Sequence, residues 1–524
     1  MKYCVKTLFA GLCLSTMAVD AFAQRNENPN QWYTDGISEL RHTLQMKPNE
    51  NRARNVILFV GDGMGMSTVA AARIFEGQLR NQSGEENVLA FEELPYLALA
   101  KTYNTDRQVG DSAGAMTAIM TGVKTRTGLI GLNQNAELGN CKSAQGNAVT
   151  SFLEQAAKAG MGTGIVTTTR ITHATPAATY AHAPHRDWES DKDMPAQARE
   201  QGCKDLAVQL VEFPLGGGID VVLGGGRGKF MPNSAADPEG SGMGEREDKR
   251  DLIAEWTQKY PNSVYVWNDK QFASLDPAKT ERVLGLFNRS DMNYEVDRKG
   301  DAGGEPSLTD MTKKAVAILK KNPEGFFLMV EGGRIDHAHH AGNAYRALDE
   351  TREFASAVRA AMSAVDMKET LIIVTADHGH ALTISGTPKR GNAILGKMIG
   401  PNGNNPAKAL DERPYTTLNY MTGPGAIAAR DPLSKTGARR DLGNVDTSKP
   451  DYMQQALIPL SGGEHSGEDV PIYAGGPWAQ LFHRTVEQNY IYQVMRYATF
   501  ERPKAPDRNA SKTKPRKQKA TRKE

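Results

Sequence analysis

Acidic and histidine side chains that can bind metal ions stand just after several continuous apolar runs of the sequence. Asp62, Glu331, and the adjacent Asp377 and His378 each lie within four residues of the end of such a run. A short continuous apolar run is typical of a strand buried on both faces of a parallel sheet. Because ligands of open α/β sheets bind beyond the carboxyl ends of the strands, we expect these side chains to meet in one metal site.

The stretch EGGRIDHAHH adds a second set of candidate ligands. Asp336 and His340 are four residues apart, so that on a helix they share one face and can bind the same ion. His465, in GGEHSGEDV, is a further candidate that on its own would be interpreted as an ordinary loop histidine. Mixed carboxylate and imidazole ligands suit zinc, whereas Asp62 and Glu331 together with a hydroxyl oxygen suit magnesium.

Ser112 lies in the stretch VGDSAGAM, where a helix is expected to begin. One interpretation is a helix cap, since Ser and Asp side chains accept hydrogen bonds from the free N–H groups at a helix start. The other is a nucleophile placed where those N–H groups and the helix dipole favour an anion such as phosphate. The predicted metal sites favour the second interpretation. Of two metal ions beside a serine, one can deprotonate the serine while the other polarises the substrate.

The two ends of the chain differ in composition from its middle. The chain has 524 residues, of which 39% are hydrophobic and 24% charged, as in ordinary globular proteins. Residues 1–23 carry two lysines, an apolar stretch too short to span a membrane, and an Ala-Phe-Ala cleavage site, which predicts a signal peptide. We therefore expect a periplasmic or secreted protein without a transmembrane segment.

The last residues, 501–524, contain ten basic and three acidic side chains and almost no apolar ones. This composition predicts a disordered tail. Such a tail either binds nucleic acid or an anionic membrane surface, or is a solvated appendage. No specific nucleic-acid partner is expected.

Between these ends, the expected strands alternate with amphipathic helical patterns, which predicts an α/β fold with a doubly wound sheet. The apolar runs are followed by patterns such as SFLEQAAKAG and NAYRALDETREFASAVRAAMSAV. We expect an N-terminal helical arm at 24–50, a main domain at 51–500, and within it an insert at 386–462. The insert is rich in Gly, Pro and Asn and is expected to be mostly irregular.

Four cysteines are present, and two of them, Cys4 and Cys13, lie in the predicted signal peptide. In an oxidising compartment the remaining Cys141 and Cys203 can form one disulfide. Two free buried thiols are the alternative.

The motifs GDGMG, DSAG, THATPAATYAH, VEGGRIDHAHHAG, TADHGH and EHSGEDV, in this order and separation, together resemble the alkaline phosphatases. The resemblance runs from about residue 28 to about residue 500. It is closer to the animal-type branch than to the shorter enterobacterial one, on stretches such as RDWESDKDMPAQAREQGCKD and RPYTTLNYMTGPG. It implies a mostly parallel sheet flanked by helices, a crown-like insert, a homodimer, and hydrolysis of small phosphate monoesters.

The resemblance also implies roles for individual residues. Ser112 matches the serine that becomes phosphorylated, and Arg186 matches the arginine that holds two phosphate oxygens. Cys141 and Cys203 match a disulfide pair. The implied metal ligands are Asp336, His340 and His465 for a first zinc, Asp62, Asp377 and His378 for a second, and Asp62, Thr175 and Glu331 for one magnesium.

Two departures from the family pattern affect the metal chemistry. His173 and His337 stand where enterobacterial members have Asp and Lys, and they are expected to tune the metal-bound water from outside the ligand set. The animal enzymes also bind calcium. The matching region here offers Glu239, Phe287 and Glu305, with Asn288 in place of an expected acid.

Rival interpretations remain open on the sequence. A related enzyme for phosphodiesters or sulfate esters shares the two-metal fold, but DSAGAM lacks the C/S-x-P-x-R setting of sulfatases. The magnesium pair Thr175 and Glu331 disfavours a diesterase. A non-catalytic metal- or polyanion-binding protein is disfavoured by Ser112 and Arg186, which such a protein does not need.

Overall fold

The computed structural model describes residues 29–240, 242–426 and 439–501 of the chain. The predicted signal peptide, the start of the arm, nearly all of the basic tail and residues 427–438 of the insert lie outside the described residues.

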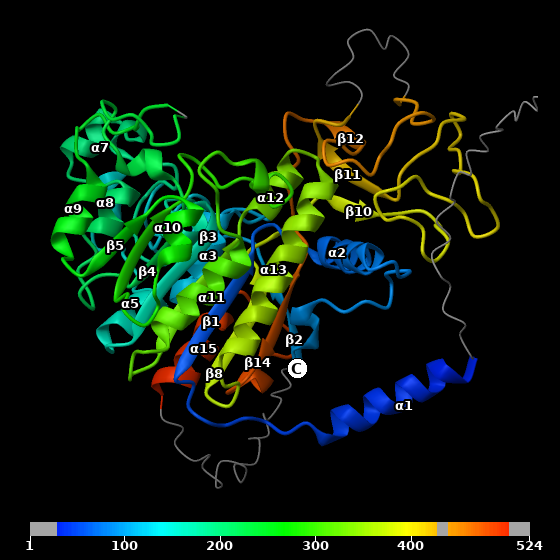
Figure 1. Cartoon of the computed structure of the whole chain (residues 1–524), viewed down its shortest axis with the longest axis horizontal. Helices are drawn as coiled ribbons and strands as arrows, with labels where there is room; N and C mark the ends of the chain where they lie inside the picture. Colours follow the sequence, from blue (N-terminus) through cyan, green and yellow to red (C-terminus); the bar gives the residue numbers. More distant parts are fainter. Residues whose placement is uncertain (1–28, 241, 427–438, 502–524) are drawn as a thin grey trace, which may run out of the picture.

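A ten-stranded sheet runs through the centre of the molecule (Figure 1). Only β14 runs antiparallel to its neighbours, so the sheet is mostly parallel. In spatial order the strands are β15 (Thr485–Glu487), β2 (Tyr96–Lys101), β14 (Val470–Gly475), β8 (Thr370–Ala376), β1 (Asn55–Gly61), β7 (Phe326–Gly332), β3 (Gly162–Arg170), β4 (Val221–Gly225), β6 (Arg282–Leu286) and β5 (Ser263–Val266).

The three central strands β8, β1 and β7 are buried along their whole length. Val60 of β1 is in register with Glu331 on one side and Thr375 on the other, so the carboxyl ends of these strands meet at one edge. The continuous apolar runs correspond to this burial on both faces, because neither face of these strands contacts water. The predicted doubly wound α/β sheet is confirmed.

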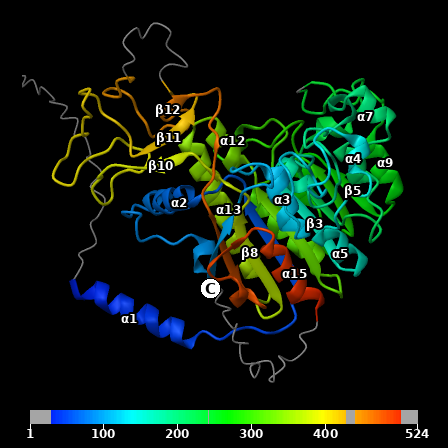
Figure 2. The ribbon, with the colours of Figure 1, turned by 180° about the vertical axis from the view of Figure 1, so that it is seen from behind.

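Helices cover both faces of the sheet (Figures 1 and 2). One layer contains α11 (Leu308–Leu319), α13 (Ala344–Ala364) and α2 (Met66–Leu79), with α13 packed between the other two. The opposite layer contains α3 (Ser112–Thr121), α5 (Phe152–Lys158) and α15 (Tyr490–Phe500), which pack against one another. The other α-helices of the described residues are α1 (Pro29–Gln45), α4 (Cys141–Ala144), α6 (Ala174–Ala177), α7 (Ala196–Glu200), α8 (Leu206–Val211), α9 (Leu252–Lys259), α10 (Asp269–Ser274) and α12 (Arg334–His340).

The insert contributes two strands, β11 (Leu418–Gly423) and β12 (Ala456–Pro459), to a small sheet whose third strand, β10 (Leu382–Ile384), directly precedes the insert. The rest of its described residues form turns and irregular segments. A two-stranded ladder of β9 (Gly379–His380) and β13 (His465–Ser466) joins the segment just after the insert to the segment that follows β8.

Helix α1 lies apart from the body in both views (Figures 1 and 2). Its apolar side chains are largely exposed; Tyr33 and Leu44 each keep 75% of their surface. The division of the chain into arm, main domain and insert stays a prediction.

Candidate active site

Four side chains form the first metal-capable group, at the edge where the central strands end. They are Asp336 and His340 from α12, His380 from β9 and His465 from β13. Asp336 lies 3.2 Å from His340 Nε2, 3.1 Å from His380 Nε2 and 3.5 Å from His465 Nε2. The i, i+4 spacing on a helix therefore brings Asp336 and His340 together as predicted, and the antiparallel pairing of β9 with β13 adds the other two.

A second group, fully buried, consists of Asp62 after β1 and of Asp377 and His378 after β8. His378 Nε2 lies 3.5 Å from Asp62 Oδ1 and 3.4 Å from Asp377 Oδ2. The Ser112 hydroxyl lies 3.3 Å from the same nitrogen. An ion held by this group would lie beside the serine oxygen.

The third group contains Asp62, Glu331 and His173. Thr167 and Thr169 donate hydrogen bonds to Glu331 Oε2. Glu331 Oε1 and both Asp62 oxygens are buried without a hydrogen-bond partner among the described residues. Such buried carboxylate oxygens are costly to leave unpaired, and a hard cation such as magnesium suits them.

A backbone carbonyl lies against Nδ1 of each predicted zinc histidine. His340 Nδ1 is 2.5 Å from Gly463 O, and His465 Nδ1 is 3.0 Å from Gly110 O. His378 Nδ1 is 3.2 Å from the carbonyl of the next residue, Gly379. A proton on Nδ1 leaves Nε2 with its lone pair free, which is the arrangement that metal-bound histidines use.

Burial and mutual proximity shift the pKa values of the carboxyl groups in the site. Burial, together with the nearby carboxylates, raises the pKa of Asp62 well above its usual range. Burial also raises the pKa of Glu331 to about 7 and that of Asp377 to about 6. Burial has the same effect on Asp336, but hydrogen bonds from His340 and His380 outweigh it and hold its pKa well below normal. Bound cations would stabilise all of these carboxylates in the ionised form.

Asp111 joins the serine to the arginine. Asp111 is the N-cap of α3, and Ser112 is the first residue of the helix. The helix-cap role considered for Ser112 in the sequence therefore belongs to Asp111. Arg186 Nη1 donates to Asp111 Oδ2 at 3.1 Å, and Arg186 Nη2 lies 3.3 Å from His173 Nε2. The guanidinium therefore stands beside the helix start, where its fork can hold two oxygens of an anion.

His173 and His337 lie edge to face, with ring centroids 5.4 Å apart. His337 Nδ1 is 2.8 Å from Arg334 Nη1, and Asp291 lies 3.8 Å from that nitrogen. The resemblance assigned both histidines outside the ligand set. The structure places His173 close enough to Asp62 and Glu331 to reach the same ion.

Two further histidines were not among the sequence candidates. His380 belongs to the first group. Its position two residues after His378 could have indicated a further ligand, since alternate residues of a strand share a face. His339 is fully buried between Thr68 Oγ1, at 2.9 Å, and the Tyr420 hydroxyl, at 2.7 Å. Nothing in its local sequence distinguishes this structural role from that of a ligand.

The expected calcium region lies in a separate network. Asn288 Nδ2 donates to Glu305 Oε1 at 2.8 Å, and buried Arg227 donates to Glu239 Oε2 at 2.8 Å. Burial raises the pKa of Glu305 to about 7. Neither glutamate belongs to the three metal-capable groups found among the described residues. Calcium binding at Glu239, Phe287 and Glu305 stays a prediction.

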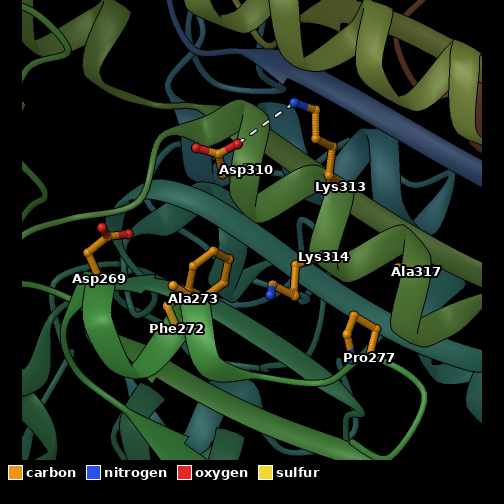
Figure 3. A pocket seen from close by; sticks show the side chains of 8 residues that line it. All are labelled: Asp269, Phe272, Ala273, Pro277, Asp310, Lys313, Lys314 and Ala317. Atoms are coloured by element: carbon orange, nitrogen blue, oxygen red, sulfur yellow. Dashed lines mark ion pairs between the residues drawn. The ribbon is translucent and has the colours of Figure 1, made fainter.

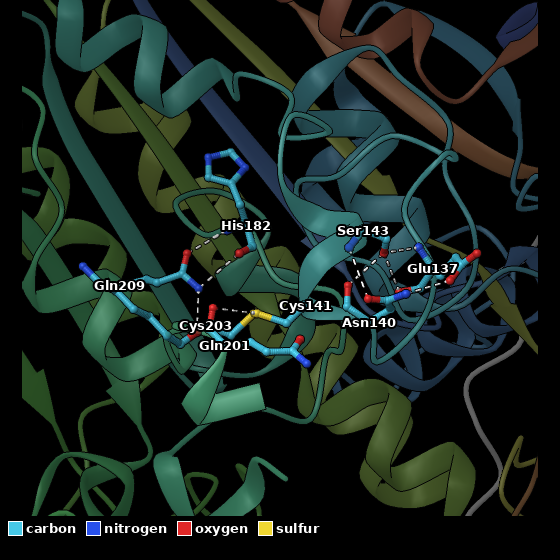
Figure 4. The surroundings of a disulfide bond; sticks show 9 residues. Glu137, Asn140, Cys141, Ser143, His182, Gln201, Cys203 and Gln209 are labelled. Carbon is cyan, nitrogen blue, oxygen red and sulfur yellow. Dashed lines mark hydrogen bonds between the residues drawn. A yellow bond between two sulfur atoms is a disulfide. The ribbon is translucent and has the colours of Figure 1, made fainter. Parts of the chain in front are cut away.

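Cys141 and Cys203 form a disulfide with a Cα–Cα distance of 6.0 Å, which confirms the predicted pair (Figure 4). Beside it is a cavity of about 500 Å³, lined in part by Tyr180 and His182. Another cavity, of about 390 Å³, lies between α10 and α11, with Phe272 and Lys314 on its wall (Figure 3). No predicted metal ligand lines either cavity.

A doubly wound sheet that gathers buried histidines and carboxylates beside a serine at a helix start defines a class of metal-dependent α/β hydrolases. Comparison with known proteins narrows this class. The family model described as alkaline phosphatase matches residues 53–500. The chain belongs to the alkaline phosphatase family and is a phosphate-monoester hydrolase.

Individual relatives agree with this assignment. The chain is 43% identical over 500 residues to the tissue-nonspecific isozyme of alkaline phosphatase from Rattus norvegicus, covering 94% of this chain and 92% of that protein. It is 44% identical over 485 residues to an alkaline phosphatase from Gadus morhua, covering 91% and 98%. The resemblance to the animal-type branch is thus confirmed.

Among solved structures, alkaline phosphatase from Thermus thermophilus superposes with a TM-score of 0.61 at 25% identity, covering 88% of this chain and 94% of that one. This likeness confirms the fold. In the described part of the chain, no helix combines the length and apolar character needed to cross a membrane.

Proposed function

We propose that this chain is an exported alkaline phosphatase that hydrolyses small phosphate monoesters through a phosphoserine on Ser112, with two zinc ions and one magnesium ion. The observation that carries the proposal is the position of the Ser112 hydroxyl, 3.3 Å from His378 Nε2 and one residue from Asp111, which binds Arg186. The residues that would hold the metals are Asp336, His340 and His465 for one zinc, Asp62, Asp377 and His378 for the other, and Asp62, Thr175 and Glu331 for magnesium.

When bound, the metals lower the pKa of coordinated hydroxyl groups and neutralise charge on the transferring phosphoryl group. The chain's own residues supply the rest. Ser112 Oγ attacks phosphorus, the alcohol leaves, and hydrolysis of the phosphoserine releases phosphate. Arg186 binds two phosphoryl oxygens in parallel, which a lysine cannot do. His173 stands against Arg186 Nη2 and helps to orient it.

The donor chemistry supports this choice of metals. The first group mixes one carboxylate with histidines, which suits zinc, and hydroxyl and carboxylate oxygens at Thr175 and Glu331 suit magnesium. His173 and His337 are proposed to tune the metal-bound water from outside the ligand set.

Export and dimerisation complete the proposal. The composition of residues 1–23 and the disulfide between Cys141 and Cys203 both suit an oxidising compartment outside the cytoplasm. The exposed apolar side chains of α1 support a homodimer in which this helix packs on the partner.

Metal analysis combined with a substrate comparison tests the function. The purified enzyme is expected to contain about two zinc ions and one magnesium ion per chain. It is expected to release p-nitrophenol from the phosphate monoester far faster than from the bis-ester, and EDTA should abolish this activity. A preference for the bis-ester, or full activity in metal-stripped protein, would contradict the proposal.

A further inference from the structure

The loop between β2 and α3 brings a neutral side chain against Asp111 from the side away from Arg186. Asn104 is 4% exposed, and its Nδ2 donates to Asp111 Oδ1 at 2.8 Å. The backbone N–H of Gly114 donates to the same oxygen at 3.1 Å. Asp111 Oδ2 accepts from Gly128 N and from Arg186 Nη1, both at 3.1 Å. Each carboxylate oxygen thus accepts two hydrogen bonds.

The two oxygens of the Asp111 carboxylate have different partners. Oδ1 is held by Asn104 and by the first turn of α3, and Oδ2 by Arg186 and the Gly128 amide. Rotation of the carboxylate would break both sets together. Two of the four donors are side chains, and of these Asn104 is neutral and Arg186 is charged. Asn104 can therefore orient the carboxylate without replacing Arg186 as its ion-pair partner.

The sequence of α3 makes room for this amide. A Cβ atom at Gly114 would lie 2.7 Å from both Asn104 Nδ2 and Asn104 Oδ1. Glycine inside a helix costs about 1 kcal/mol relative to alanine. Glycine at the third position of α3 therefore leaves space for the Asn104 amide, although it lowers the stability of the helix.

Asn104 is itself held in place by the loop that carries it. Its N–H donates to Arg107 O at 3.1 Å and the Arg107 N–H donates to Asn104 O at 3.3 Å, and its Nδ2 also donates to Thr127 Oγ1 at 3.1 Å. The loop continues to Gly110, whose carbonyl faces His465 Nδ1 at 3.0 Å. Asn104 and Gly110 are buried, whereas residues 105–109 between them are exposed. The hydrogen bonds that close this loop can hold the Asn104 side chain in place, although it has no reacting atom of its own.

We propose that Asn104 is a positioning residue for phosphate: through Asp111 it fixes Arg186 at the start of α3. The proposal rests on the proposed function, because it takes Arg186 to bind phosphate. Asn104 touches neither Ser112 nor a metal ligand in its hydrogen bonds, so it acts only through Asp111.

Inhibition by inorganic phosphate tests the proposal in the metal-loaded enzyme. Asn104→Ala should raise the Ki of phosphate by about three- to tenfold, because the lost hydrogen bond is made to Asp111 and only part of its effect reaches phosphate through Arg186. In an Arg186→Ala background the same substitution should change Ki less than about twofold, since its effect passes through the guanidinium. Gly114→Ala, which displaces the amide from the other side, should reproduce the rise seen in Asn104→Ala.

A matched control separates positioning from general loss of stability. Asn55, at the start of β1, is a buried asparagine whose Nδ2 donates to Thr370 Oγ1 at 3.0 Å. Asn55→Ala should lower the melting temperature comparably and leave Ki and metal content unchanged.

Three results would overturn the inference. Unchanged Ki in both Asn104→Ala and Gly114→Ala removes it, while the proposed function stands if Arg186→Ala still weakens phosphate binding. An equal rise in Ki with and without Arg186 shows that Asn104 acts by another route. Unchanged Ki in Arg186→Ala overturns the phosphate clamp of the proposed function, and the inference with it.

Discussion

Ser112, the proposed nucleophile, is only 2% exposed and yet lies beside a metal-capable histidine. The N-cap position of Asp111 sets the first turn of α3, and this turn aims the serine oxygen at His378. A hydroxyl there meets the free N–H groups of the helix start, which favour the negative charge of a bound phosphate.

Replacement of this serine gives a direct prediction. Ser112→Ala should abolish the covalent phosphoenzyme and lower kcat by at least about a hundredfold, because only direct attack by water remains. Acid-quenched protein labelled from a radioactive monoester measures the phosphoenzyme. Ser356→Ala on α13 is the matched control, since its hydroxyl bonds only within its own helix. Wild-type kcat in Ser112→Ala with its metals bound would refute the role.

Arg186 is predicted to act by geometry as well as by charge. Arg186→Lys keeps the charge but replaces two parallel N–H donors by one ammonium, so KM and the Ki of phosphate should rise about tenfold with a smaller change in kcat. Arg359→Lys is the control, because Arg359 is half exposed and pairs with Glu93 at the surface. Steady-state kinetics decide the outcome; equal KM in the wild type and Arg186→Lys would exclude the clamp.

Helix α13 carries a buried carboxyl group that has no role in the proposed reaction. Glu350 is 3% exposed and accepts a hydrogen bond from the Glu295 backbone N–H at 2.6 Å. Burial raises its pKa to about 8, from an ordinary value of 4.5. Folding therefore keeps this group protonated over a range of pH in which the unfolded chain loses the proton.

The consequence for stability has a definite sign. Between pH 4.5 and 8 the folded state binds more protons at Glu350 than the unfolded state, so its contribution to stability falls as pH rises. Glu350→Gln should remove this fall and make the variant relatively more stable at pH 8.5 than at pH 5. Denaturant unfolding at the two pH values measures it. Glu369→Gln, at an exposed site, should follow the wild type, and a wild-type pH slope in Glu350→Gln would contradict the argument.

The apolar side chains of α1 are exposed in the single chain and are expected to be covered by a partner in the assembled molecule. The guanidinium of Arg390, in the insert, stands 5.8 Å from the centre of the Trp32 ring. Further apolar side chains are exposed on the small sheet of the insert, including Leu457 at 70%. Both segments are proposed to form the dimer contact.

Two truncations test this arrangement. Deletion of residues 24–46 should weaken the dimer, because it removes the exposed apolar helix. Deletion of residues 503–524 should leave dimerisation and rate unchanged, since that segment has too few apolar residues to offset its ordering entropy. Light scattering measures both. A monomeric full-length protein, or a tail deletion that dissociates the dimer, would overturn the arrangement.

The fold class and several of the metal-capable residues could be predicted from the amino-acid sequence alone. The runs at 56–60, 326–330 and 371–374 are strands because strands buried on both faces must be apolar throughout. The spacing of Asp336 and His340 predicted a shared helix face from local geometry alone. The disulfide followed from the family motif, since two cysteines permit pairing without requiring it.

Contacts between residues that are distant in the chain could not be predicted in this way and are known from the three-dimensional fold. His380 joins Asp336 because β9 pairs with β13, and Asn104 reaches Asp111 because a closed loop folds back on α3. His173 approaches Glu331 across two neighbouring strands, β3 and β7. Such contacts depend on strand order and packing, which local periodicity does not encode, whereas burial and helix spacing leave a pattern in consecutive residues.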